Sequence, residues 1–274
     1  MDSNEEYEEE EEIEELVDSD SPENNKNFEG EGDLKNYYNY NPEYFNMKES
    51  SLKPITFNSI KLIEKKYKSV CKILYGKHPG TGFFCKINLD GAIKKLLFTN
   101  YHVLNEKYIK IGSKIDIYND NSMKNINITK DRFTCFSKSL DYICIEILPK
   151  DNFKNFFEVE RQIYEQFLEN NSITSIMDEY RYHDLVLIQY RNFGKKSDEE
   201  IYFCQGHLKE YDGKRIFYSN NIKYGAKGAP IISMNSSLDI IGMHNHCYNK
   251  KKKICCNGIL FNNILLDIKN KLNK

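Results

Sequence analysis

The stretch "KYGAKGAPIIS", Lys223 to Ser233, places the strongest constraint on the fold. Gly225 and Gly228 bracket a sharp turn, and the apolar run after the turn is typical of a buried strand. Successive backbone N–H groups in a turn of this kind can converge on an anion. Lys227 stands between the two glycines. The chemistry that the turn can support therefore depends on which other side chains of the protein lie near Lys227.

The rest of the chain has the pattern of an all-β protein. From about Lys53 onward, short β-rich runs are broken by Gly, Asn and Asp. We expect ten strands in two groups, at 70–75, 82–87, 96–99, 114–118, 142–147, 184–190, 201–206, 215–219, 229–233 and 239–244. Two groups of strands indicate two small barrels or a sandwich.

Two helices are expected around the second group of strands. Asp151 can cap a helix, and the aromatic residues up to Asn170 recur near helical period, which predicts a helical linker or insertion over 151–180. Apolar residues between Ile259 and Leu272 have similar spacing, which predicts a packed C-terminal helix. The first barrel is then expected over 54–150, and the second barrel with its helix over 181–274.

The charge of the chain is unevenly distributed. Residues 1–33 contain sixteen Asp or Glu and one cation, Lys26, so this segment carries −15, while 38 cations and 25 anions give the remainder +13. The acidic run repels itself and has few large apolar groups, which predicts a disordered tail over 1–53. The tail is either a solvated segment or an arm that folds back on the basic body.

The sequence contains no visible secretion or membrane signal. No basic segment followed by an apolar one opens the chain, and no apolar run reaches the ~18 residues that a membrane span needs. We therefore expect an intracellular protein whose cysteines are reduced thiols. These are Cys71, Cys85, Cys135, Cys144, Cys204, Cys247, Cys255 and Cys256.

Two residues of the first half are candidates for acid–base chemistry. His102 follows the apolar run "LLFT" in a short turn, where a histidine can act from a rigid strand end. Asp141 opens the alternating strand "YICIEI", where a carboxylate can orient such a base or can merely end a turn. In chain order, the histidine and the aspartate precede the glycine turn around Lys227.

Five stretches together resemble the trypsin-like serine peptidases of the chymotrypsin fold, in particular their intracellular-type forms. They are "GTGFFCKI" (80–87), "LLFTNYHVL" (96–104), "LDYICIEI" (140–147), "GAKGAPIIS" (225–233) and "IIGMHNH" (240–246). The resemblance covers about Lys66 to Ile268, and it implies two antiparallel six-stranded β-barrels with the site between them. It also implies that His102 is the general base, that Asp141 orients it, and that Gly225 and the backbone of Lys227 form the oxyanion hole.

The chain departs from this family at the nucleophile. The family's serine corresponds to Lys227, whose amine is protonated near pH 7 and would form a stable amide with an acyl group. No serine or cysteine nearby has the context of a replacement, so we expect a catalytically inactive homologue that binds peptides or proteins. An active peptidase with an unusual nucleophile and a structural or assembly protein are the two alternatives.

Several binding expectations follow. His244 resembles the histidine that lines the primary pocket of relatives preferring acidic or glutamine side chains, and we place Asn221 in the same substrate-binding region.

A zinc site is a further hypothesis, based on His244, His246, Cys247, Cys255 and Cys256. These residues lack C-x₂-C spacing, so we expect no metal and no cofactor. The lysine run at 250–253 has no nucleic-acid-binding motif beside it, so we expect no nucleic-acid partner.

Overall fold

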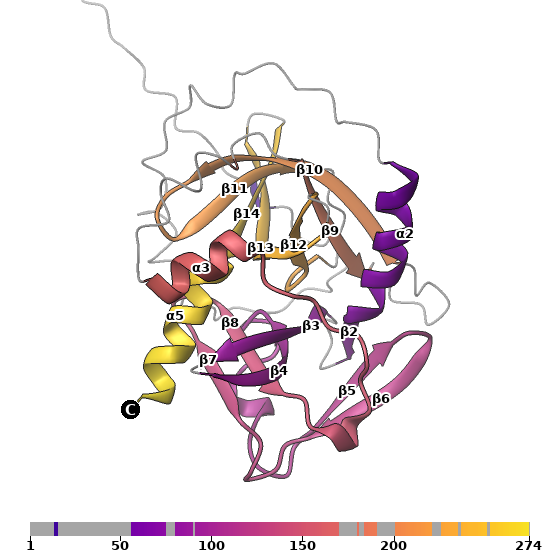
Figure 1. Ribbon diagram of the computed structural model, residues 1–274, viewed down its shortest axis with the longest axis vertical. Coiled ribbons are helices and arrows are strands. Elements are labelled where there is room, and N and C mark those ends of the chain that lie inside the picture. Colours follow the sequence, from indigo (N-terminus) through magenta and orange to yellow (C-terminus); the bar gives the residue numbers. More distant parts are fainter. Residues whose placement is uncertain are drawn as a thin grey trace, which may run out of the picture.

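The described residues form two β-sheets and three α-helices, α2, α3 and α5 (Figure 1). The computed structural model describes residues 14–15, 56–74, 80–89, 91–169, 180, 184–190, 201–220, 226–234, 237–250 and 253–273. Helix α2 (Phe57–Lys66) precedes the first sheet, and its N-cap Thr56 accepts a hydrogen bond from the Ser59 N–H. The all-β architecture with two groups of strands that the sequence predicts is confirmed.

The first sheet is a half-barrel of seven antiparallel strands in the order β6-β5-β2-β3-β4-β8-β7. Within the described part of the chain, the outermost strands β6 and β7 do not pair with each other. The strands are β2 (Val70–Leu74), β3 (Gly80–Leu89), β4 (Ala92–Thr99), β5 (Lys114–Asn119), β6 (Ser122–Asn127), β7 (Thr134–Ser137) and β8 (Tyr142–Glu146). Short 3₁₀ turns lie at Tyr67–Ser69, Glu106–Tyr108 and Pro149–Asp151.

The second sheet is a closed barrel of six strands. Its order is β13-β12-β9-β10-β11-β14, and β14 pairs back with β13 to close the ring. Closure leaves few free backbone groups at an edge. The strands are β9 (Asp184–Tyr190), β10 (Ile201–Tyr211), β11 (Arg215–Asn220), β12 (Pro230–Ser233), β13 (Ile240–Lys250) and β14 (Lys253–Leu260).

A cluster of four phenylalanine rings joins the C-terminal helix to the first sheet. Helix α5 (Phe261–Leu272) begins with Phe261, whose ring lies 5.0 Å from that of Phe98 and 6.1 Å from that of Phe83. Phe157 meets Phe83 edge to face at 6.3 Å. All four rings are fully buried. The predicted C-terminal helix is confirmed, and its last turn carries Lys269 and Lys271, which favours a helix C-terminus.

The helix expected from Asp151 begins ten residues later. Helix α3 covers Arg161–Glu169, whereas residues 153–160 run extended between the sheets. Phe157 donates its N–H to the Phe84 carbonyl and accepts from the Lys86 N–H. Asp151 ends the 3₁₀ turn instead of starting an α-helix: its carboxylate accepts from the Leu148 N–H at 2.7 Å and from both terminal nitrogens of buried Arg132 at 2.7 and 2.9 Å. The aromatic residues of this segment pack against the first sheet rather than along a helix face.

The expectation that every cysteine is a reduced thiol is wrong for one pair. Cys247 and Cys256 form a disulfide. They lie directly opposite each other in the antiparallel register of β13 and β14, where side chains of one face meet across the strands. Five others are free and buried: Cys71, Cys85, Cys135, Cys144 and Cys204.

The predicted disordered tail over 1–53 lies outside the described residues, except for strand β1 (Glu14–Glu15). These two residues pair antiparallel with Tyr248 and Asn249 at the end of β13. No helix among the described residues is both long and apolar enough to cross a membrane.

The two barrels meet at the turn that contains Gly228. Gly228 has φ +83°, and a Cβ on it would lie 2.2 Å from the Thr81 carbonyl oxygen and 2.4 Å from Thr99 Oγ1. In the same place the Thr81 N–H donates to the Lys227 carbonyl at 2.9 Å, and the Gly228 N–H donates to the His244 carbonyl at 3.1 Å. The turn of the second barrel is therefore seated directly on the backbone of the first.

This contact predicts the effect of replacing Gly228. Gly228→Ala should lower the free energy of unfolding by about 2–4 kcal/mol, because backbone strain at positive φ adds to a clash with backbone oxygen. Gly213→Ala is the matched control: Gly213 also has positive φ (+90°), but nothing lies within 4 Å of its Cβ position. The control should lose only about 1–2 kcal/mol, as measured by urea unfolding. Equal losses in the two variants would contradict the seating of this turn on the first barrel.

Candidate functional site

Asp141 is held in a fixed position at the start of β8. It has φ +51°, a left-handed conformation that aspartate tolerates better than most residues. Its N–H donates to the Lys138 carbonyl at 3.2 Å, and its own carbonyl accepts from Asn100 Nδ2 at 3.0 Å. These bonds close the turn between β7 and β8, so the carboxylate projects from a rigid base.

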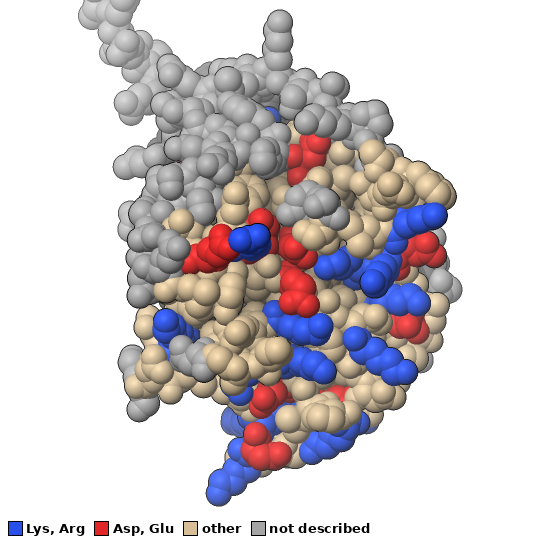
Figure 2. All heavy atoms as spheres, in the orientation of Figure 1, with Lys and Arg blue, Asp and Glu red and all other residues tan. Residues whose placement is uncertain are grey.

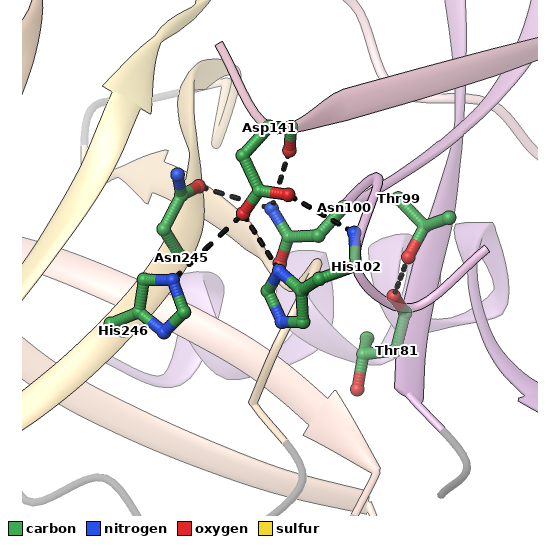
Figure 3. A network of polar contacts seen from close by, with 7 residues as sticks. All are labelled: Thr81, Thr99, Asn100, His102, Asp141, Asn245 and His246. Carbon is green, nitrogen blue, oxygen red and sulfur yellow. Dashed lines mark hydrogen bonds and ion pairs between the residues drawn. The ribbon is translucent and has the colours of Figure 1, made fainter. Parts of the chain in front are cut away.

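His102 pairs with this carboxylate (Figure 3). His102 Nδ1 lies 2.7 Å from Asp141 Oδ2, and the His102 backbone N–H donates to Oδ1 at 3.1 Å. The two side chains are 25% and 19% exposed, so the pair is open to solvent on one side. The structure therefore brings together His102 and Asp141, whose roles remain predictions. With Nδ1 engaged, Nε2 is the ring nitrogen left for other contacts.

His246 joins this pair from the second barrel. Its ring stacks on that of His102 with centroids 5.0 Å apart and planes 18° apart, and its Nε2 lies 4.0 Å from Asp141 Oδ2. Burial and the nearby charge of His102 lower the pKa of His246, while Asp141 opposes this shift. The imidazole of His246 is therefore neutral at pH 7.

A β-bulge explains why His246 faces the site. Strict alternation along β13 would place His244 and His246 on the same face. The register with β14 shifts between them, since His244 pairs with Gly258 and His246 with Asn257. Asn245 is the extra residue, and a bulge re-aims the side chains that follow it. His246 is consequently 43% exposed, whereas His244 is buried.

His244 lies inside the second barrel. Its Nδ1 is 2.5 Å from the hydroxyl of buried Tyr218, and its Nε2 is 3.8 Å from Cys247 Sγ. Burial lowers the pKa of His244 well below its usual range, and burial raises the pKa of Tyr218. Both groups are therefore neutral, and Tyr218 fixes the orientation of the imidazole.

Lys227 stands at the tip of the turn seated on the first barrel. The Ala229 N–H donates to the Ala226 carbonyl at 2.7 Å, which closes the turn around Lys227 and Gly228. Lys227 is exposed, and its charge contributes to the lowered pKa of both His244 and His246. Its ammonium forms no ion pair within the described ranges. The predicted site residues Gly225 and Asn221 lie outside the described residues.

Sequence reasoning missed two asparagines that connect the site. Buried Asn100 donates through Nδ2 to the Asp141 carbonyl and to Asn245 Oδ1, each at 3.0 Å. One side chain thus ties the Asp141 turn to the β13 bulge. The position of Asn100, between Thr99 and the candidate His102, was a usable signal, but the importance of Asn245 depends on a bulge that no local pattern announces.

Two of the three cysteines of the zinc hypothesis are not available as ligands. Cys247 and Cys256 are bonded to each other, and the side chain of Cys255 lies outside the described residues. His244 points into the barrel toward Tyr218, and His246 turns toward His102. The five residues therefore do not form one cluster among the described side chains.

The geometry of the His102–Asp141 pair supports proton transfer through the imidazole of His102. A carboxylate on Nδ1 fixes the ring orientation of an imidazole and stabilises its protonated form, which leaves Nε2 to exchange a proton with a neighbour. The neighbour required for covalent hydrolysis is a nucleophile on an adjacent turn. Lys227 lies exposed on the turn seated on the first barrel and carries an ammonium group.

The fold is chymotrypsin-like, as the sequence resemblance implied, with one closed six-stranded barrel and one half-barrel of seven strands where two six-stranded barrels were expected. An inactive form of a serine-to-alanine mutant of Rv3671c from M. tuberculosis H37Rv aligns with a TM-score of 0.54 and 12% identity, covering 81% of this chain and 94% of that one. The inactive form of the Rv3671c protease aligns with the same score and 11% identity, over 81% and 97% of the two chains. At this identity the likeness establishes the fold alone.

Comparison of the amino-acid sequence with known proteins does not identify a family for this chain. No family model matches the chain. Carbamoyl phosphate synthase large chains from two Clostridium botulinum strains, Eklund 17B and Alaska E43, are each 24% identical over 155 residues, which is 54% of this chain. The match spans only 14% of those proteins, so their activity has no bearing on the site described above.

The His244–Tyr218 contact yields a stability prediction. Tyr218→Phe should lower the free energy of unfolding by about 1–3 kcal/mol, because buried Nδ1 of His244 loses its partner. Tyr211→Phe removes a hydroxyl that donates to the Gly213 carbonyl at the surface, and it should cost less than about 0.5 kcal/mol. Urea unfolding of both variants makes the comparison. A negligible cost for Tyr218→Phe would show that this contact does not orient His244.

Proposed function

We propose that this chain is a trypsin-like serine protease homologue that binds peptides or proteins without hydrolysing them. The observation that carries the proposal is Lys227, which occupies the tip of the turn beside an ordered His102–Asp141 pair. In this reading His102 and Asp141 keep the places of the base and its orienting carboxylate. Gly225 and the backbone of Lys227 keep those of the oxyanion hole, and only the nucleophile is replaced.

Lysine is a poor nucleophile in this setting for three reasons. Its amine is protonated near pH 7, and the amide it would form with an acyl group resists hydrolysis. Its positive charge also opposes the imidazolium that His102 would have to become. In subtilisin, loss of the serine costs on the order of 10⁶ in turnover. The alternative of an active peptidase needs either a Lys227 that overcomes these three obstacles or another residue that acts as the nucleophile.

The proposed ligand is a peptide segment with an acidic or amide side chain. His244 is buried and neutral, and if the Tyr218 hydroxyl donates to Nδ1, then Nε2 carries the hydrogen. An Nε2–H donor favours a carbonyl or carboxylate oxygen, which would have to reach His244 inside the barrel, and the charge of Lys227 acts on the same histidine and attracts negative charge. Asn221 would complete the binding region.

An intramolecular contact of the acidic tail is a second element of the proposal. Its support is the pairing of Glu14 and Glu15 with Tyr248 and Asn249, next to Lys250 at the end of β13. Backbone pairing to a strand edge is a common way for an extended segment to bind. This contact also favours the alternative in which the fold serves as an assembly scaffold that uses the acidic arm.

The face shown in Figure 2 gives no support for nucleic acid as the partner. Figure 2 shows Lys and Arg side chains interspersed with Asp and Glu over the half of this face that the first sheet forms. Several of these charges are paired, including Lys94 with Glu146 at 3.3 Å and Lys86 with Glu158 at 3.3 Å. Nucleic-acid surfaces typically present clustered basic residues instead.

A serine-directed fluorophosphonate probe tests the proposal. The wild-type chain should not be labelled, whereas Lys227→Ser should gain labelling, because the proposal keeps the base and the oxyanion donors in place around the turn. In-gel fluorescence after a fixed exposure measures the difference. The double variant Lys227→Ser with His102→Ala is the matched control and should lose most of the gain.

The outcomes separate the competing readings. Labelling of the wild type that is lost in His102→Ala would overturn the inactive homologue and favour an active peptidase. Failure of a folded Lys227→Ser variant to label would show that the turn does not hold a nucleophile position, which would favour the scaffold alternative.

A further inference from the structure

Three potential metal ligands meet beside the turn of Lys227. They are His102 from the turn after β4, Asp141 from the turn before β8, and His246 from β13, as Figure 3 shows. One ligand atom from each residue lies within 4.8 Å of the others. His102 Nδ1 is 2.7 Å and His246 Nε2 is 4.0 Å from the same oxygen, Asp141 Oδ2. Two imidazoles and a carboxylate on three separate elements therefore converge on one point.

The spacing suits a small divalent ion. Tetrahedral ligands at about 2.0–2.1 Å from zinc lie roughly 3.3 Å from one another. The two observed separations, 2.7 and 4.0 Å, fall on either side of that value. A slightly longer distance from His102 Nδ1 to Asp141 Oδ2 and a slightly shorter distance from His246 Nε2 to the same oxygen would make the two separations equal. His246 has room for this movement, because its side chain is 43% exposed.

The carboxylate at the centre is already held by an outer layer of hydrogen bonds. The His102 N–H donates to Asp141 Oδ1, which leaves Oδ2 directed at the two imidazoles. Asn100 holds the Asp141 backbone and also binds Asn245, the residue before His246. Outer partners of this kind fix the orientation of metal ligands and strengthen binding.

We propose that His102, Asp141 and His246 form a binding site for a zinc-type divalent metal ion, with a fourth position open to solvent. Imidazole and carboxylate together suit zinc and its transition-metal neighbours better than magnesium or calcium. For Nδ1 of His102 to bind the ion, its proton moves to Nε2 of the same ring, so the imidazole stays neutral. The site has no thiolate ligand, which distinguishes it from the cysteine-based zinc hypothesis.

Metal binding and the protease-like arrangement exclude each other. An ion on Nδ1 and Oδ2 replaces the hydrogen bond that orients His102 as a base. The ion also lies within the electrostatic reach of Lys227, whose charge already acts on His246. The inference does not depend on peptide binding, because it rests on three side chains whose contacts are independent of any peptide.

Cobalt titration of the full-length, untagged, chelator-treated chain tests the site. Co²⁺ should bind with saturation at one equivalent, giving visible absorption of a nitrogen- and oxygen-coordinated ion, and Zn²⁺ should displace it. His246→Ala should weaken Co²⁺ affinity at least about tenfold, since even outer-layer partners change metal affinity 10–100-fold. Asp116→Asn removes an exposed carboxylate of β5 and should leave the affinity unchanged.

A second variant tests the location of the metal site by removing a nearby positive charge. Lys227→Ala should tighten Co²⁺ binding roughly two- to fivefold, because it removes a neighbouring cation in a partly exposed place. Saturable binding that is unchanged in both His246→Ala and Lys227→Ala would place the ion elsewhere and overturn the proposal. A thiolate-to-cobalt charge-transfer band, or no saturable binding at all, would overturn it as well. Circular dichroism verifies that each variant is folded.

Discussion

The close approach of Gly228 to the first barrel is the contact on which the rest of the site depends. The Thr81 carbonyl and the Thr99 hydroxyl occupy the space that any side chain at this position would need. Thr99 Oγ1 in turn donates to the Thr81 carbonyl at 2.8 Å, so the end of β4 and the start of β3 present one rigid surface. Because His102 follows β4 directly, seating the turn here brings Lys227 to the neighbourhood of the histidine.

The site itself is assembled from positions that regular strands would not provide. Asp141 adopts a left-handed conformation at a strand end, and the bulge at Asn245 turns His246 away from the barrel interior. Backbone irregularities of this kind are over-represented next to functional sites. Asn100 connects both irregularities through one amide group, so a segment of each barrel is held to the same side chain.

Local patterns predicted much of the fold, because apolar alternation is a local property. They located the cores of most strands and the C-terminal helix, and with the glycine turn they indicated the His102–Asp141 pair. Strand β6 was missed because it carries only Met123 and Ile126 as apolar residues, and β14 because its charged start resembles a hairpin tip. Asp151 was assigned to a helix cap because its partner Arg132, nineteen residues earlier, is not visible in a local window.

The second barrel shows a different limit of sequence reasoning. The Cys247–Cys256 pairing depends on the register of β13 with β14, and that register contains the bulge. The same bulge decides which histidine faces the site, so neither the disulfide nor the role of His246 follows from alternation. The pairing of β13 with β14, rather than residue type, makes His244 a buried neutral group and leaves His246 accessible.

The proposed function is that this chain, with Lys227 in place of a nucleophile, binds peptides and leaves them intact. Incubation of the full chain with a complex peptide library, followed by mass spectrometry of both the bound and the free fractions, tests it most directly. The account predicts intact bound peptides enriched in Glu, Asp or Gln and no new peptide termini. New termini that depend on His102 would contradict it.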